Sequence, residues 1–138
     1  MKPIHDFEVK NMLKMAEEAK DRAYAPYSKF RVGACLKGAT GAYYLGSNVE
    51  NASYGATICA ERMALLKAVY EGERVFDALA IGGDGGGCPP CGMCLQMLSE
   101  FCDPEMPVIF RNISSDITVV SLSELMPKAF LKERLTNA

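Results

Sequence analysis

The sequence predicts an α/β fold in which a mixed sheet lies between two layers of helices, a three-layer α/β/α sandwich. Its composition, with 49% hydrophobic and 23% charged residues, is that of an ordinary globular protein. Helical and strand patterns alternate along the chain, and a continuous apolar run at residues 75–81 suits a strand covered on both faces. The length of 138 residues is near the commonest domain size. We therefore expect residues 1–138 to form a single domain.

The first part of the chain predicts a helix followed by a β-hairpin. Apolar residues at helical spacing favour a helix over residues 7–23, with Asp6 as its cap. Pro26 ends this helix because a proline disfavours helical geometry at the residue before it. Two strand-like runs, 30–37 and 42–49, are separated by a glycine-flanked turn and predict the hairpin.

The middle of the chain predicts a helix, a strand and a loop. Residues 57–70 form the strongest helical pattern, with Thr57 as its cap and Gly72 just beyond its end. The apolar run 75–81 follows as a strand. The glycine-rich segment 82–87 is expected to be a loop, and it lacks the Gly-Lys-Ser/Thr ending of a phosphate-binding loop.

The last part of the chain predicts a helix, two strands and a final helix. The helix begins at Pro90 and runs to about Phe101, and the strands cover residues 107–110 and 117–121. Residues 122–135 are broken by a proline into a short turn and a final helix.

Charge and cysteine usage limit the classes of function. The net charge is −2 and the basic residues are scattered, so a polymeric DNA or RNA partner is disfavoured. No apolar run suits a signal peptide or a membrane span, and we expect a cytoplasmic protein without membrane partners. In a reducing compartment, six cysteines indicate metal binding or buried thiols rather than disulfides. Cys35 and Cys102 are expected in the core, and the single histidine, His5, is expected to be neither ligand nor base.

Two short segments carry the chemistry: Cys59-Ala60-Glu61 and Pro90-Cys91-Gly92-Met93-Cys94. A Cys-x-x-Cys pair alone is weak evidence, because it also occurs in redox pairs and zinc fingers. Together and in this order, each opening a predicted helix, the segments match the signature of zinc deaminases, in which three protein ligands hold the metal and the glutamate is not a ligand.

Elementary chemistry supports the same ligand set. A helix N-terminus carries free N–H groups and partial positive charge, which favour thiolate over thiol. Cys91 and Cys94 are three residues apart and share a helix face, so with Cys59 they can hold one Zn²⁺. Cys88 is the rival fourth ligand, but the extended path through Pro89-Pro90 is expected to carry it away from the site. Three ligands leave a fourth position open to water, as catalytic zinc sites do.

Glu61 and Arg62 are the candidate catalytic and supporting residues. Glu61 can pass protons from a zinc-activated water to a pyrimidine ring and to departing ammonia. The alternative interpretation is that Glu61 is an acid in the first helical turn that complements the helix dipole. Zn²⁺ and three thiolates together carry a net charge of −1, and Arg62 is the adjacent cation that could offset it. The alternative interpretation is that Arg62 is a solvated arginine on the helix surface.

The chain resembles the small homotetrameric cytidine deaminases over nearly its whole length. Five ordered stretches carry the resemblance: residues 26–34, 48–54, 57–62, 90–94 and 125–130. The resemblance implies a five-stranded sheet, one zinc per subunit, and active sites completed by neighbouring subunits. The implied reaction is hydrolysis of cytidine or 2′-deoxycytidine to the uridine product and ammonia.

The resemblance also implies roles for individual residues. Phe30 packs on the base, Asn48 and Glu50 hold the ribose 3′-hydroxyl, and the Ala60 backbone meets the pyrimidine edge. Tyr54 and Phe130 reach into a neighbour's site, and Arg62 hydrogen-bonds the zinc thiolates. Without the resemblance, Phe30 and Phe130 are expected to be core residues.

The sequence departs from the family at two places and leaves three rival functions open. Leu95 stands where the family usually has arginine, and Pro89 where it usually has serine. The rivals are deamination of a cytosine antibiotic such as blasticidin S, editing of RNA or DNA, and a zinc-stapled or redox module without catalysis. The acidic isoelectric point disfavours editing.

Overall fold

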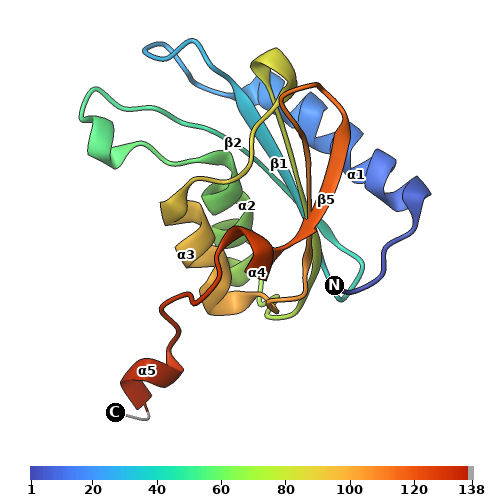
Figure 1. The fold of residues 1–138 in the computed structure, drawn as a ribbon. Helices are drawn as coiled ribbons and strands as arrows, with labels where there is room; N and C mark the ends of the chain where they lie inside the picture. The colour runs from blue at the N-terminus through green and yellow to red at the C-terminus, as the bar shows by residue number, and fades with distance from the viewer. Residues whose placement is uncertain (137–138) are drawn as a thin grey trace.

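A mixed five-stranded sheet forms the centre of the computed structural model, which describes residues 1–136 (Figure 1). The strand order is β2-β1-β3-β4-β5, in which β3 and β4 are parallel and the other neighbouring pairs antiparallel. The strands are β1 (Val32–Gly38), β2 (Tyr43–Ser47), β3 (Phe76–Gly83), β4 (Pro107–Arg111) and β5 (Ile117–Ser121). The predicted hairpin is confirmed, because β1 and β2 pair antiparallel with Cys35 opposite Leu45.

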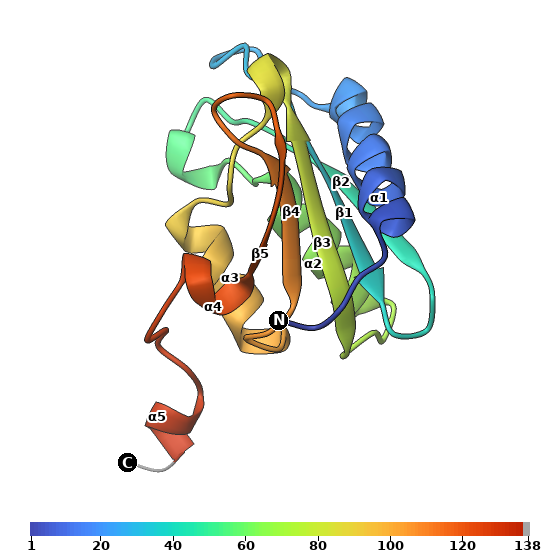
Figure 2. The same cartoon turned by 45° about the vertical axis from the view of Figure 1, so that its right-hand side comes forward.

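Helices cover both faces of the sheet, which confirms the three-layer sandwich (Figure 2). Helix α1 (Asp6–Ala19) packs on one face, and α2 (Ala60–Tyr70) and α3 (Gly92–Phe101) pack on the other. The short helices α4 (Leu122–Leu125) and α5 (Glu133–Thr136) follow the last strand, as the proline between them predicts. No helix within residues 1–136 combines the length and apolarity that a membrane crossing needs.

The strands bury alternate side chains in two apolar cores, one on each face. In β1, Ala34 and Leu36 face α2 and α3, whereas Cys35 faces α1. Cys102 lies in the larger core, so both predicted core thiols are confirmed. Burial raises the pKa of each of these two thiols to about 12, which keeps them protonated and unreactive.

Two predicted helix caps are wrong. His5 rather than Asp6 caps α1, because the His5 carbonyl accepts the first helical bond from Val9 N at 3.0 Å. Thr57 does not cap α2, because a short antiparallel bridge between Val49 and Ile58 keeps this segment extended. The helix therefore begins three residues later than predicted.

Other boundaries also differ from the prediction. The first helix gives way to a 3₁₀ turn at Lys20–Arg22, and α3 begins after Cys91 rather than at Pro90. Gly82 and Gly83 complete β3 instead of lying in a loop, and a 3₁₀ turn at Asp84–Gly86 follows them.

A glycine in β2 lets the start of α2 lie directly against the sheet. A Cβ atom on Gly46 would lie 2.3 Å from the Ala60 carbonyl oxygen and 2.7 Å from the Ala64 nitrogen. Both are backbone atoms and cannot turn away as a side chain could. The glycine therefore sets where α2, and the residues at its N-terminus, stand over the sheet.

We predict that Gly46→Ala lowers the free energy of unfolding by about 1–3 kcal/mol, the usual cost of overpacking a close contact. Urea denaturation followed by circular dichroism measures this change. Gly55→Ala is the matched control, since a Cβ at Gly55 meets no atom within 4 Å. Equal stability of the two variants would contradict the close-approach argument.

Candidate active site

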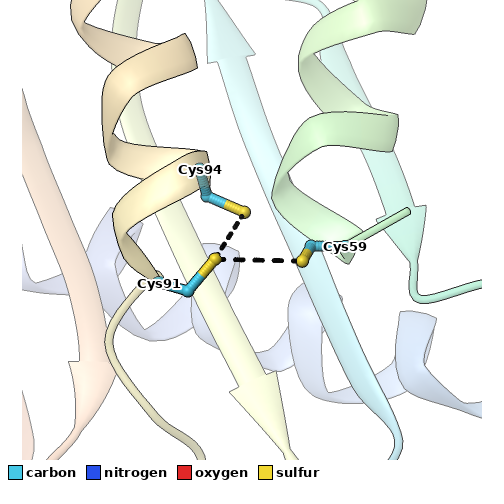
Figure 3. Close-up of side chains that lie close together, drawn as sticks. All are labelled: Cys59, Cys91 and Cys94. Atoms are coloured by element: carbon cyan, nitrogen blue, oxygen red, sulfur yellow. Dashed lines mark hydrogen bonds between the residues drawn. The ribbon is translucent and has the colours of Figure 1, made fainter. Parts of the chain in front are cut away.

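Three cysteines from two helix starts converge on one point (Figure 3). Cys59 caps the N-terminus of α2, Cys91 caps the N-terminus of α3, and Cys94 lies in the first turn of α3. Their sulfur atoms all lie within 4.8 Å of one another. The Cys91 sulfur is 4.0 Å from that of Cys59 and 3.5 Å from that of Cys94.

These distances fit a tetrahedral zinc ion. A Zn–S bond of about 2.3 Å places two tetrahedral ligand sulfurs about 3.8 Å apart, and the two measured separations lie on either side of this value. A disulfide would need a separation of about 2.05 Å, and all three cysteines are free. Cys59, Cys91 and Cys94 are the zinc ligands, as the sequence predicts.

The local backbone leaves the sulfur atoms available to a metal. Neither Cys59 nor Cys91 uses its side chain to cap its helix, because no side-chain cap bond is made at either position. The backbone carbonyls make the first helical bonds instead, to Met63 N and to Leu95 N. The positive ends of both helix dipoles thus point at the three sulfurs and favour their ionised form.

Cys88 lies outside the three-sulfur group. It is half-buried and follows the glycine-rich turn, and Pro89-Pro90 separates it from Cys91. Burial raises the pKa of its thiol, and the acidic groups of the site, Glu61 first among them, add to the effect. Within residues 1–136, the group that could hold a metal contains three cysteines and no fourth protein ligand.

Arg62 supplies positive charge at the edge of the sulfur group. Its Nη2 donates hydrogen bonds to the Thr57 carbonyl at 2.9 Å and to the Cys59 sulfur at 3.6 Å. Hydrogen bonds from Cys94 and from Arg62 lower the pKa of the Cys59 thiol. The Cys59 thiolate in turn raises the pKa of Cys94, since two adjacent sulfurs resist sharing negative charge.

Leu95 carries no charge, so the positive charge near the three sulfurs comes from Arg62. Its side chain is buried and packs into the larger apolar core with Leu98 and Leu65. A leucine there contributes packing but no charge to the thiolates. Arg62 also carries a buried Nε atom for which the described residues offer no hydrogen-bond partner.

Glu61 is a buried carboxyl group beside the sulfurs. It is the second residue of α2, and only 5% of its surface is exposed. Burial raises the pKa of Glu61 to about 7, and the nearby Cys59 thiolate adds to this rise. A carboxyl group with such a pKa can both accept and release a proton near neutral pH.

An open pocket of about 350 Å³ lies between the loop after α1 and the turn before α2. Its lining residues are Tyr27, Ser28, Glu50, Tyr54 and Thr57. Glu50 accepts hydrogen bonds from the backbone nitrogens of Tyr27 and Ser28, at 2.9 and 3.1 Å, and from the Ser28 hydroxyl. These bonds lower the pKa of Glu50, so its carboxylate is negative at neutral pH.

Asn48 ties the same loop to β1. Its Oδ1 accepts from Val32 N and its Nδ2 donates to the Phe30 carbonyl, both at 2.9 Å. Phe30 is 39% exposed, so it is not the core residue that the sequence alone suggests. The structure thus brings Phe30, Asn48 and Glu50 together on one side of the site.

Tyr54 and Phe130 point away from the core of their own chain. Tyr54 is 75% exposed and packs edge-on against Tyr27, with ring centroids 5.8 Å apart. Phe130 is 59% exposed, and its carbonyl accepts a hydrogen bond from Gln96 at 2.7 Å. Phe130 is therefore not a core residue either, and both rings are available to another molecule.

Sequence reasoning assigned no role to Ser28, although it lies within the stretch that carries the resemblance. The structure places its hydroxyl between Glu50 and the Phe30 backbone nitrogen. The available signal was a serine two residues before Phe30, the spacing of a local side-chain-to-backbone turn.

Comparison with known protein families supports the assignment of the three cysteines as zinc ligands. Residues 8–110 match the family model of the cytidine and deoxycytidylate deaminase zinc-binding region. The chain belongs to this family. Helices α2 and α3, all of α1 after its first two residues, and the three ligand cysteines lie within the matched range.

Individual relatives match over nearly their full lengths. A cytidine deaminase from Sporosarcina psychrophila is 45% identical over 132 residues, covering 95% of this chain and 97% of the relative. One from Halalkalibacterium halodurans is 44% identical over 91% of this chain and 96% of the relative. The crystal structure of cytidine deaminase from Burkholderia pseudomallei superposes with a TM-score of 0.81 at 43% identity, covering 88% of this chain and 98% of that one.

We predict that the purified protein holds one zinc ion per chain, and that Cys88→Ala retains it, because Cys88 lies outside the sulfur group. Cys94→Ser should lose most of the zinc, since it removes one of three thiolates. Elemental analysis after dialysis against a weak chelator measures both. Loss of zinc in Cys88→Ala would show a closed, four-sulfur site instead.

Proposed function

We propose that this protein is a cytidine deaminase that hydrolyses free cytidine or 2′-deoxycytidine to the corresponding uridine and ammonia. One observation carries the proposal: a buried carboxyl group, Glu61, beside three metal-binding sulfurs that leave one coordination position for a small molecule. A structural zinc site is closed by four protein ligands and needs no such acid.

When bound, zinc polarises a water molecule and lowers its pKa, which supplies the nucleophile for attack on a pyrimidine ring. The Glu61 carboxylate accepts one proton of the attacking water and delivers it to N3 of the cytosine ring. Glu61 then carries the second proton of that water to the amino group on C4. The amino group leaves as ammonia, and the water oxygen becomes the carbonyl of uridine.

The pKa of Glu61 suits both transfers. A carboxylate at its ordinary pKa would be a weak base toward water, whereas burial moves the pKa of Glu61 close to 7, where the group both accepts and releases a proton. Arg62 donates a hydrogen bond to the Cys59 sulfur at 3.6 Å and so helps to hold this thiolate in place. We assign Arg62 a supporting role and Glu61 the catalytic role.

The proposed substrate is a free nucleoside. We assign Phe30 to the face of the base, the backbone of Ala60 to its edge, and Asn48 with Glu50 to the ribose 3′-hydroxyl. The exposed Phe30 ring supplies a π-face for a base, and a carboxylate beside an amide suits a sugar hydroxyl. The net charge of −2 supports a small substrate over a nucleic acid.

We also propose a homotetramer in which Tyr54 and Phe130 complete the site of a neighbouring subunit. Both rings are exposed on their own chain, and the segment between α4 and α5 extends away from the body of the chain (Figure 1). A chain of 15.0 kDa leaves a large share of its surface exposed, which favours association. None of the six cysteines, all of which lie within residues 1–136, forms a disulfide, which is typical of a reducing compartment, so we propose a cytoplasmic location.

We predict that Glu61→Gln lowers kcat on cytidine by roughly three orders of magnitude while zinc content stays at the wild-type value, because the amide cannot shuttle protons. The loss of ultraviolet absorbance as cytidine becomes uridine measures kcat, and elemental analysis measures zinc.

Blasticidin S is the comparison substrate in the same assay, and Ser114→Ala, at an exposed serine in the turn between β4 and β5, is the control for activity lost during purification. A Glu61→Gln variant with activity within tenfold of wild type would contradict the proton-shuttle role. A wild type that prefers blasticidin S to cytidine would contradict the assigned substrate.

We predict a native mass of four times the 15.0 kDa chain mass in analytical ultracentrifugation. Phe130→Ala should raise KM for cytidine, because the ring is proposed to contact substrate in a neighbouring subunit. A fully active monomer would contradict the shared-site proposal.

A further inference from the structure

The Ser28 hydroxyl lies between the two parts of the proposed nucleoside site. It donates a hydrogen bond to Glu50 Oε2 and accepts one from the Phe30 backbone nitrogen at 3.0 Å. Glu50 is on the side assigned to the sugar, and Phe30 is on the side assigned to the base. One side chain thus contacts both parts.

The Glu50 carboxylate has little freedom left. Its two oxygens offer about four acceptor positions. Two on Oε1 receive the backbone nitrogens of Tyr27 and Ser28, and one on Oε2 receives the Ser28 hydroxyl. One acceptor position on Oε2 remains for a donor from outside the chain, and its direction is set by the Ser28 bond.

The amide of Asn48 is constrained in the same way. One N–H of Nδ2 is used on the Phe30 carbonyl, and Oδ1 is used on Val32 N. The second N–H of Nδ2 remains as a donor. One free donor and one free acceptor are what a single sugar hydroxyl requires, provided that both are held in position.

The backbone around Ser28 is strained, which indicates that the contacts hold it. Lys29, between Ser28 and Phe30, has a φ of 59°, a left-handed conformation that is unfavourable for a lysine. Strain of this kind persists only where surrounding contacts determine the geometry. Those contacts are the hydrogen bonds that Ser28 and Asn48 make to the Phe30 backbone, together with the bond from Lys29 N to the Ala25 carbonyl at 3.1 Å.

We propose that Ser28 is a positioning residue for nucleoside recognition: its hydroxyl aims the Glu50 carboxylate at the sugar hydroxyl and fixes the backbone that carries Phe30. This inference rests on the proposed function, since it concerns how the cytidine site is held. Ser28 acts through Glu50 and Phe30, so its loss weakens substrate binding while the proton chemistry at Glu61 is unchanged.

The test compares wild type, Ser28→Ala and Ser28→Thr on cytidine and on 3′-deoxycytidine. Because a hydrogen bond to a charged group is lost, Ser28→Ala should raise KM for cytidine roughly tenfold, with kcat within about twofold. The effect should shrink to about twofold on 3′-deoxycytidine, which lacks the hydroxyl that donates a hydrogen bond to Glu50, so that only the part acting through Phe30 remains. Ser28→Thr keeps a hydroxyl and should restore most of the affinity.

A double-mutant cycle with Glu50→Gln tests whether the effect of Ser28 on KM acts through Glu50. If Ser28 acts through Glu50, adding Ser28→Ala to Glu50→Gln should change KM by much less than it does in wild type. Ser114→Ala, at an exposed serine in the turn between β4 and β5, is the matched control and should match wild type.

Three results overturn the inference and are distinguishable from one another. If wild type deaminates cytidine but Ser28→Ala leaves KM within twofold, or raises it equally on both substrates, Ser28 does not position the sugar contact and the proposed function stands. If wild type shows no activity on cytidine, the proposed function falls and takes this inference with it. A Ser28→Thr variant as impaired as Ser28→Ala would also overturn the role of the hydroxyl.

Discussion

The meeting of two helix N-termini over one face of the sheet is the constraint on which the rest of the structure depends. Helices α2 and α3 follow β2 and β3, and both lie on the face of the sheet opposite α1. Their first residues present three sulfurs to one point and direct two helix dipoles at it. Glu61 and Arg62 follow Cys59 in the first turn of α2, so both are placed relative to that point. A shift of either helix along the sheet would separate the ligands.

Much of the fold and of the metal site could be predicted from the sequence, because the signals were local. The spacing of Cys91 and Cys94 on one helix face needs only the geometry of a helix, and the strand at residues 117–121 was predicted with its observed bounds. The start of α2 was misplaced because Thr57 lies in a segment held extended by a bridge to Val49, a contact between residues that are not adjacent in the chain. The approach of Cys59 to the other two cysteines depends on the topology of the sheet. In the sequence, only the two cysteine segments taken together, which match the zinc-deaminase signature, could indicate it.

The loop before β1, which bears Tyr27, Ser28 and Phe30, was harder to predict because its contacts join segments that are distant in sequence. The hydrogen bonds of Glu50 to Tyr27 and Ser28 span more than twenty residues, and no periodic pattern encodes them. The resemblance named Asn48 and Glu50, but it gave no indication that these side chains also hold the loop that bears Phe30. In the proposed function, recognition of the sugar and placement of the base are therefore coupled through one hydrogen-bonded segment. Leu95 shows a related limit. The sequence shows a leucine where the family usually has arginine, but only the structure shows that this side chain lies in the apolar core.

The account rests on zinc held by three sulfurs with one position free for a small molecule. X-ray absorption at the zinc edge of the purified, fully loaded protein tests this most directly. The account predicts three sulfur scatterers at about 2.3 Å and one lighter oxygen or nitrogen scatterer near 2.0 Å. Four sulfur scatterers would show a closed structural site and would contradict the account.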